Sequence, residues 1–225
     1  MEVSTQKKDQ DFHIKVWDLP TRLFHWLLAG LVITSFVTAS LGGNLMILHM
    51  RAGYAVLALL IFRLIWGTLG GYHSRFTSFV RGPREVFRYA GALTDKDSPR
   101  HLGHNPMGGW SVVAMLGVIL LQALTGLFAN DDIFIEGPLY PWVSKAVSDQ
   151  LTRIHHLNAW TIATVVVVHV GAILFYLIIR RENLVGPMIS GFKTWHEPGP
   201  SVNAKTWVAL LIAGLAGTGV YLLVR

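Results

Sequence analysis

The chain has 225 residues, of which 52% are hydrophobic and only 14% are charged, and it contains no cysteine. Soluble domains carry about 25% charged residues, so this composition favours a protein that resides in a lipid bilayer. Without cysteine there can be no disulfide, no thiolate-bound iron–sulfur cluster and no CxxCH attachment of a c-type haem. The net charge of +6 comes from basic residues between apolar stretches, which argues against nucleic acid as a partner.

Five apolar stretches of about 20 residues follow one another, and this length crosses a bilayer core of about 30 Å. They cover residues 23–41, 46–66, 110–128, 151–179 and 207–224. Pro20 suits the first turn of the first helix. The first apolar run is too long for a secretory signal and contains His25, so we expect it to be a retained span. The fifth run is short and rich in Gly and Ala.

The charges of the connecting segments predict the orientation. Basic residues occupy the segments that five alternating spans would place on the N-terminal side: Lys7, Lys8, Lys15, Arg22, Arg75, Arg81, Arg84, Arg88, Lys96, Arg100, Arg180, Arg181 and Lys193. On the other side, residues 39–45 have no charge, and residues 130–150 hold four acidic residues against Lys145 alone. Because basic loops stay in the cytoplasm, we expect a bacterial inner-membrane protein with a cytoplasmic N-terminus and a periplasmic C-terminus.

The polar connector of residues 75–105 also holds Phe79, Val86, Phe87 and Tyr89. We expect part of it to lie at the membrane interface as a short amphipathic helix.

Four of the ten histidines fall within the predicted spans, where ionisable residues are usually functional. His155 and His169 are 14 residues apart, which on a helix places them within about 40° of one face and about 21 Å apart along the axis. Depth pairs the other two: His25 faces His169 on the cytoplasmic side, and His49 faces His155 on the outer side. His156 points about 140° away from His169, so it is the weaker candidate and would cap, contact a propionate or meet a quinone.

Two stacked bis-imidazole sites of this kind suit haem iron, for which neutral imidazole is a normal axial ligand. A single intramembrane His is often a helix–helix hydrogen-bonding residue, but two depth-matched pairs are harder to explain in that way. Zinc and copper need compact ligand clusters, which the wide spacing does not offer.

Haem propionates need cationic partners at the membrane rims. The candidates are Arg22, Arg63, Arg51 and Arg153, and Arg63 is favoured because it falls inside the second span. The alternative for each is a basic side chain that anchors the helix at the interface. Glycines within the spans would let helices approach a flat porphyrin, although ordinary small-residue packing explains them equally well: Gly30, Gly53, Gly117, Gly126 and Gly171.

In order along the chain, these residues resemble a known family. Arg22-Leu-Phe-His25-Trp26 is similar to the RxxHW opening of the prokaryotic cytochrome b561 and nickel-hydrogenase b-type cytochrome group. Residues 49–54 and 63–67 resemble its second helix, residues 103–109 (Gly-His-Asn-Pro-Met-Gly-Gly) resemble the element before its third, and His155 and His169 match its fourth-helix pair. The resemblance covers residues 12–180 and implies a four-helix core with two b haems on His25, His49, His155 and His169.

The expected fold class is therefore an all-α membrane protein, with a four-helix transmembrane bundle that holds two haems and a fifth C-terminal transmembrane helix. Residues 1–180 would form the dihaem domain, and residues 181–225 a cytoplasmic linker with the additional helix. A quinone, ubiquinone or menaquinone, would bind near His101, His104, Asn105 and Arg100. For these residues a structural turn, which Asn-Pro and Gly-Gly favour by themselves, is the stronger alternative.

The resemblance implies electron transfer between the quinone pool and a periplasmic redox partner of the cytochrome c or hydrogenase type. The acidic segment 131–149, with its aromatic residues, could dock such a partner. One alternative is a stand-alone superoxide:quinone oxidoreductase, but acidic outer loops would not steer superoxide. A second is a transporter with a His proton relay, for which we find neither broken helices nor inverted repeats. Whether the chain is an electron-transfer subunit or an enzyme stays open, and membrane lipid and a second copy of the chain are further partners.

Overall fold

The computed structural model describes residues 11–93, 95, 100–200, 202 and 204–225; Lys7, Lys8 and Lys96 of the orientation argument lie outside this part. Five helices are long and apolar enough to cross a membrane, in agreement with the predicted fold class. They are α1 (Leu19–Leu41), α2 (Met46–Leu69), α5 (Pro106–Gly126), α6 (Lys145–Ile178) and α8 (Thr206–Leu223).

Three of these helices begin several residues earlier than the apolar stretches indicate. In each case a polar side chain caps the helix upstream of the first apolar residues, as Asp18, Asn105 and Ser144 do for α1, α5 and α6. Hydropathy therefore marks where the membrane begins, whereas the capping residue marks where the helix begins.

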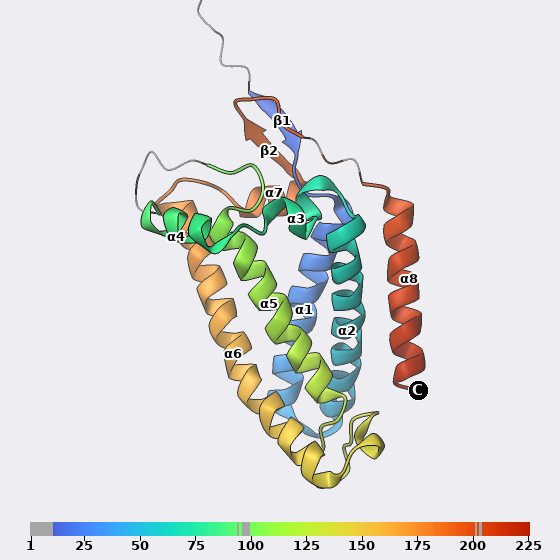
Figure 1. Ribbon diagram of the computed structural model, residues 1–225. Helices are drawn as coiled ribbons and strands as arrows, with labels where there is room; N and C mark the ends of the chain where they lie inside the picture. Colours follow the sequence, from blue (N-terminus) through green and yellow to red (C-terminus); the bar gives the residue numbers. More distant parts are fainter. Residues whose placement is uncertain (1–10, 94, 96–99, 201, 203) are drawn as a thin grey trace, which may run out of the picture.

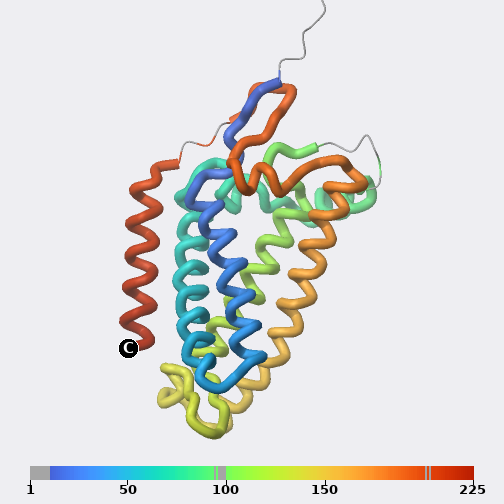
Figure 2. Tube along the Cα trace, turned by 180° about the vertical axis from the view of Figure 1, so that it is seen from behind, coloured from blue at the N-terminus to red at the C-terminus, as the bar shows by residue number. Residues whose placement is uncertain are grey.

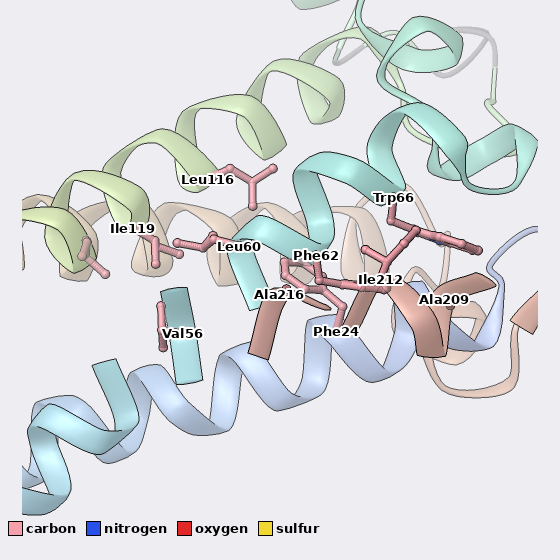
Figure 3. Close-up of a cluster of buried hydrophobic side chains, with 11 residues drawn as sticks. Phe24, Val56, Leu60, Phe62, Trp66, Leu116, Ile119, Ala209, Ile212 and Ala216 are labelled. Carbon is pink, nitrogen blue, oxygen red and sulfur yellow. The ribbon is translucent and has the colours of Figure 1, made fainter. Parts of the chain in front are cut away.

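Helices α1, α2, α5 and α6 form a bundle, and α8 runs beside α2 on its outside (Figure 1). From behind, α1 lies between α2 and α6, with α5 farther back (Figure 2). Phe24 of α1, Phe62 of α2 and Ile212 of α8 meet in the main apolar cluster, which also includes residues of α5 (Figure 3). Large apolar side chains on the outer faces stay exposed, among them Leu211 and Leu215 of α8, as expected for surfaces that contact lipid.

We call the end of the bundle where α1 begins and α6 ends the connector end (Figure 1). Its short elements are a 3-10 turn (Tyr72–Ser74), α3 (Phe76–Phe79), α4 (Pro83–Gly91), α7 (Val185–Ser190), β1 (Phe12–Lys15) and β2 (Phe192–Trp195). The two strands pair antiparallel, with Phe12 opposite Trp195. Helix α4 falls in the connector where we predicted an amphipathic helix, with Phe87 exposed and Tyr89 buried.

The opposite end, which we call the loop end, carries a short connection between α1 and α2 and a longer one between α5 and α6. Gly43–Leu45 forms a 3-10 turn between α1 and α2, and the segment between α5 and α6 contains a second one, Tyr140–Trp142. In that segment Asn130 and Glu136 form a single β-bridge.

A buried hydrogen-bond network at the connector end was not foreseen. The carboxylate of Asp18, which is 1% exposed, accepts hydrogen bonds from Thr21 N at 2.7 Å, Ser74 Oγ at 2.7 Å and Trp66 Nε1 at 3.3 Å. Thr21 and Ser74 also hydrogen-bond each other at 2.8 Å. One side chain thus joins the start of α1, the end of α2 and the connector that follows.

Candidate functional site

The structure brings the four intramembrane histidines together as two pairs. His25 of α1 faces His169 of α6 with ring centroids 6.4 Å apart, and His49 of α2 faces His155 of α6 with centroids 6.1 Å apart. The first pair, which we call the inner pair, lies toward the connector end, and the second, which we call the outer pair, lies toward the loop end, because α6 carries its two histidines 14 residues apart. These are the partners that depth along the helices predicted.

The separation within each pair suits one metal ion held between two imidazoles. A metal–imidazole bond is about 2.0–2.1 Å long, and with the nitrogen about 1.1 Å from the ring centre, two trans imidazoles place their centroids about 6.3 Å apart. The described residues contain no group of three or more His, Asp or Glu side chains that could hold a metal ion. Two protein ligands suffice only when the cofactor supplies the remaining ligands itself, as a porphyrin does.

Hydrogen bonds fix the tautomer of the outer pair. Nδ1 of His49 lies 2.9 Å from the carbonyl oxygen of Ser35, and Nδ1 of His155 lies 3.0 Å from that of Gln122. A carbonyl only accepts, so Nδ1 carries the hydrogen in both rings and Nε2 keeps its lone pair. An imidazole oriented in this way by a backbone carbonyl is ready to bind a metal.

A cavity of about 280 Å³ surrounds the outer pair between α1, α2, α5 and α6. Gly53 and Gly126 are among its lining residues, and a Cβ on Gly126 would lie 2.9 Å from Cε1 of His155. Gly126 is therefore needed where it stands, because a side chain there would displace the imidazole. His156 also borders the cavity but is exposed.

Residues of the loop end close this cavity toward the aqueous side. Asn130 and Asp131 are among the lining residues. The carboxylate of Asp131 accepts hydrogen bonds from the backbone N–H groups of Ile135, Ile133 and Phe134, which lower its pKa. A fixed negative charge thus lies at the rim of the outer cavity.

The half of the bundle toward the connector end holds buried nitrogen atoms that lack a hydrogen-bond partner in the described structure. Nδ1 of His25 is buried and has no hydrogen-bond partner within the described residues, and the same holds for one terminal nitrogen of Arg63. Arg63 is 3% exposed, and its guanidinium carbon lies 4.8 Å from the centre of the Phe76 ring and 6.0 Å from that of Phe24. Arg63 forms no ion pair within 4.0 Å of a described carboxylate, although the buried charge of Asp18 acts on it from farther away. Its terminal nitrogen without a hydrogen-bond partner suits a further anionic group such as a propionate.

The other candidate arginines have different surroundings. The Arg22 guanidinium donates to the carbonyl oxygen of Ile189, close to the end of α7, although its Nε is buried without a partner in the described structure. Trp26, one turn along α1, donates to the carbonyl of Met188 at 3.3 Å. Arg51 and Arg153 are exposed on α2 and α6 near the loop end. Holding α7 in place is thus one role of Arg22 that sequence reasoning missed.

The four quinone candidates do not share one environment. Asn105 caps α5 by accepting from Gly108 N at 2.7 Å, and its amide donates to Tyr176 Oη at 2.7 Å, so the turn alternative describes this residue well. His104 packs between Trp17 and Phe79, with ring centroids 4.7 and 4.6 Å away. Burial, and to a lesser extent the charge of Arg63, lowers the pKa of His104 to about 3, so its imidazole is neutral at physiological pH.

The remaining two candidates, His101 and Arg100, lie nearby in the chain. The rings of His101 and Tyr89 meet edge to face, and the backbone carbonyl of His101 accepts a hydrogen bond from Lys193 Nζ at 2.6 Å. Arg100 is exposed.

A bundle of apolar helices with two imidazole pairs at two depths defines a membrane protein of the b-type cytochrome class. Residues 16–191 match the family model of prokaryotic cytochrome b561, and the chain belongs to this family. Membership in this family implies haem b and electron transfer in a membrane.

Relatives with similar sequences carry hydrogenase names. The probable Ni/Fe-hydrogenase B-type cytochrome subunit of Cupriavidus necator is 26% identical over 217 residues, which covers 81% of this chain and 87% of the relative. The subunit of the same name from Rhizobium leguminosarum is 26% identical over 82% of this chain and 90% of the relative. The probable Ni/Fe-hydrogenase 1 B-type cytochrome subunit of Escherichia coli K12 is 24% identical over 89% and 98%. No solved structure matches the chain.

Proposed function

We propose that the chain holds two b haems, one between His25 and His169 and one between His49 and His155, and conducts electrons across the membrane. The observation that carries this proposal is the pair of imidazole separations, 6.4 and 6.1 Å, at two depths of the same bundle. Each haem iron would supply one-electron chemistry, and the protein would set its potential through the axial ligands and the neighbouring charges.

The chain's own residues divide the work at each site. His49 and His155 would be held by the Ser35 and Gln122 carbonyls, which make the imidazoles more basic ligands. At the inner site, Arg63 would neutralise a propionate, and its positive charge would favour the reduced state of the inner haem.

The charge distribution supports an orientation with the connector end in the cytoplasm of a bacterial inner membrane. Exposed arginines gather at the connector end on and beside α3 and α4, namely Arg75, Arg81, Arg84 and Arg88. At the loop end, the segment between α5 and α6 has Asp131, Asp132, Glu136 and Asp149 against Lys145, which pairs with Asp132 at 2.6 Å and Asp149 at 2.9 Å. This difference follows the positive-inside rule, and it would place the C-terminus in the periplasm.

Electrons would then pass between a periplasmic redox protein at the loop end and a quinone at the connector end. The hydrogenase names of the relatives favour a hydrogenase as the periplasmic partner. His104, whose buried Nδ1 has no hydrogen-bond partner in the described structure, is one candidate for a quinone contact.

The test is haem content and the reduced-minus-oxidised visible spectrum of the purified protein. We expect b-type bands with two haems per chain in the wild type. His155→Ala and His169→Ala should each retain one haem per chain. His156→Ala is the matched control and should keep two. No haem at full occupancy, or loss of the outer haem in His156→Ala but not in His155→Ala, would overturn the ligand assignment.

A second experiment tests the electron path. Proteoliposomes that contain a quinone should show reduction of both haems when a hydrogenase and hydrogen are added on the loop-end side only. Reduction from the connector-end side alone would contradict the proposed direction of access.

A further inference from the structure

The outer surface of the bundle carries an apolar recess of about 320 Å³ that the haem sites do not use. Its floor is formed by Leu60 of α2 and Leu116 of α5, which are 1% and 8% exposed. Its open sides are formed by Leu64 and Val113, which are 42% and 36% exposed. The recess is thus a groove between two transmembrane helices that opens toward the surrounding lipid.

The recess begins at the connector end and runs toward the middle of the membrane. Phe76 of α3 and Val80, which follows α3, close the recess toward the connector end. Leu120 of α5 lies at its other end, toward the middle of the membrane. From Val113 to Leu120 the helix rises by about 10 Å, roughly a third of the hydrocarbon core. Gly117 faces the groove, and a Cβ built there would meet nothing within 4 Å. The missing side chain is therefore part of what keeps the groove open.

Two arginines stand at the mouth of the recess. Arg75 directly precedes Phe76, Arg81 directly follows Val80, and both are exposed. The carbonyl of Arg81 accepts a hydrogen bond from Trp110 Nε1 at 2.8 Å, which holds this segment against α5 one turn above Val113. Neither arginine forms an ion pair with a carboxylate anywhere in the described part of the chain.

We infer that this recess is a binding site for one anionic phospholipid, with an acyl chain in the groove and the phosphate at Arg75 and Arg81. The lining is entirely apolar, so it gives no hydrogen bond to a quinone ring but accepts a hydrocarbon chain. The guanidinium groups complement a phosphate, and Trp110, 45% exposed beside them, is typical of the headgroup level of a membrane.

The lipid would also support the inner haem site from outside. The ring of Phe76 lines the groove, and the same ring lies 4.8 Å from the guanidinium carbon of Arg63. An acyl chain in the groove would therefore back the aromatic ring that covers the buried arginine. The inference itself depends only on the chain spanning a membrane, so it stands apart from the haem proposal.

The test is native mass spectrometry of the haem-loaded protein, delipidated in detergent and then titrated with phosphatidylglycerol or with phosphatidylcholine. We expect the wild type to bind about one phosphatidylglycerol molecule more tightly than any further molecules of this lipid, which gives a tight first step in the titration. Phosphatidylcholine should give no tight first step, because juxtamembrane arginines attract anionic lipid. Arg75→Gln and Arg81→Gln should each weaken this step about fivefold. The matched control is Arg225→Gln, at the far end of α8, which should bind like the wild type.

Filling the groove tests the acyl-chain half of the inference. Gly117→Leu should abolish the tight step, whereas Gly214→Leu, at a glycine of α8 that also has open space around its Cβ, should leave it unchanged. The visible spectrum should stay that of the wild type in all five variants, which shows that the fold and the haem sites are intact. Equal binding of the two lipids, an unchanged titration in Gly117→Leu, or retention of quinone in place of phospholipid would overturn the inference.

Discussion

Replacement of Gly126 by alanine should weaken the outer haem site without touching the inner one. A Cβ at this position would lie 2.9 Å from Cε1 and 3.3 Å from Nδ1 of His155. Carbon atoms in van der Waals contact are about 3.5–4.0 Å apart, so the imidazole would have to move by roughly 0.6 Å or more. Such a movement exceeds the tolerance of a metal–ligand distance, which is about 0.2 Å.

The displacement also acts on the hydrogen bond that orients the ring. Nδ1 of His155 lies 3.0 Å from the carbonyl oxygen of Gln122 on the same helix as Gly126, so pushing the ring away from α5 lengthens this bond. Loss of such an orienting contact typically lowers metal affinity about 10–100-fold. We expect the affinity of the outer site for haem to fall within that range in Gly126→Ala.

The assay is a haem titration of apoprotein in the His169→Ala background, where only the outer site should bind. Gly117→Ala is the control on the same helix, since its Cβ would meet nothing within 4 Å. Both changes add one methyl group to α5, and only the one at Gly126 brings it against His155, so the comparison tests that contact. Equal haem affinity of the two variants would refute the reasoning.

Three further outcomes follow from the connector end. Arg63→Gln should lower the midpoint potential of the inner haem by about 60 mV, because a buried positive charge that favours the reduced state is removed, and Arg63→Lys should restore most of it in a redox titration. Asp18→Ala should lower the free energy of unfolding by about 2–4 kcal/mol, measured by denaturation in detergent, because it leaves the buried Trp66 indole N–H without its acceptor. The third concerns His104, whose pKa in the folded protein, about 3, lies below its unfolded value, so the unfolded chain binds the proton first as the pH falls. Stability should therefore drop below about pH 6.5 by up to 1.4 kcal/mol per pH unit, and His104→Gln should remove this part of the slope.

Each of these expectations has a contradicting result. An unchanged midpoint potential of the inner haem in Arg63→Gln would show that the charge of Arg63 does not act on this haem. A denaturation midpoint of Asp18→Ala equal to that of the wild type would mean that the network adds no net stability. For His104→Gln, an acid dependence parallel to that of the wild type would assign the slope to other groups.

Much of the membrane architecture could be predicted from the sequence, because apolar length and helical periodicity are local properties. The 14-residue spacing of His155 and His169 on one helix predicts two depths, and alternation of the spans then predicts which histidine each one faces. The glycines within the spans were harder to separate. Gly126 is needed by His155, whereas Gly117 opens a groove, and only the packing of the neighbouring helices distinguishes the two.

The connector end was less predictable because its contacts join residues far apart in the chain. Strands β1 and β2 are four residues each and pair over about 180 positions, a distance at which no sequence pattern specifies partners. The position of Arg22 in the sequence predicts a propionate partner at the membrane rim, yet its guanidinium donates a hydrogen bond to the carbonyl of Ile189. Asp18 offered a signal that could have been used, since an Asp two residues before Pro20 is a typical helix cap.

The pairing of β1 with β2 has a consequence for how the protein is made. Strand β1 leaves the ribosome first, but its partner follows only after α1, α2, α5 and α6 have been synthesised. During insertion, the N-terminal strand must therefore wait with its backbone hydrogen bonds unmade. Its pairing then joins the two ends of the four-helix segment on one side of the membrane. The two strands can therefore pair only after all four helices have inserted, because a bundle with one helix left outside the bilayer would hold the strands on opposite sides of the membrane.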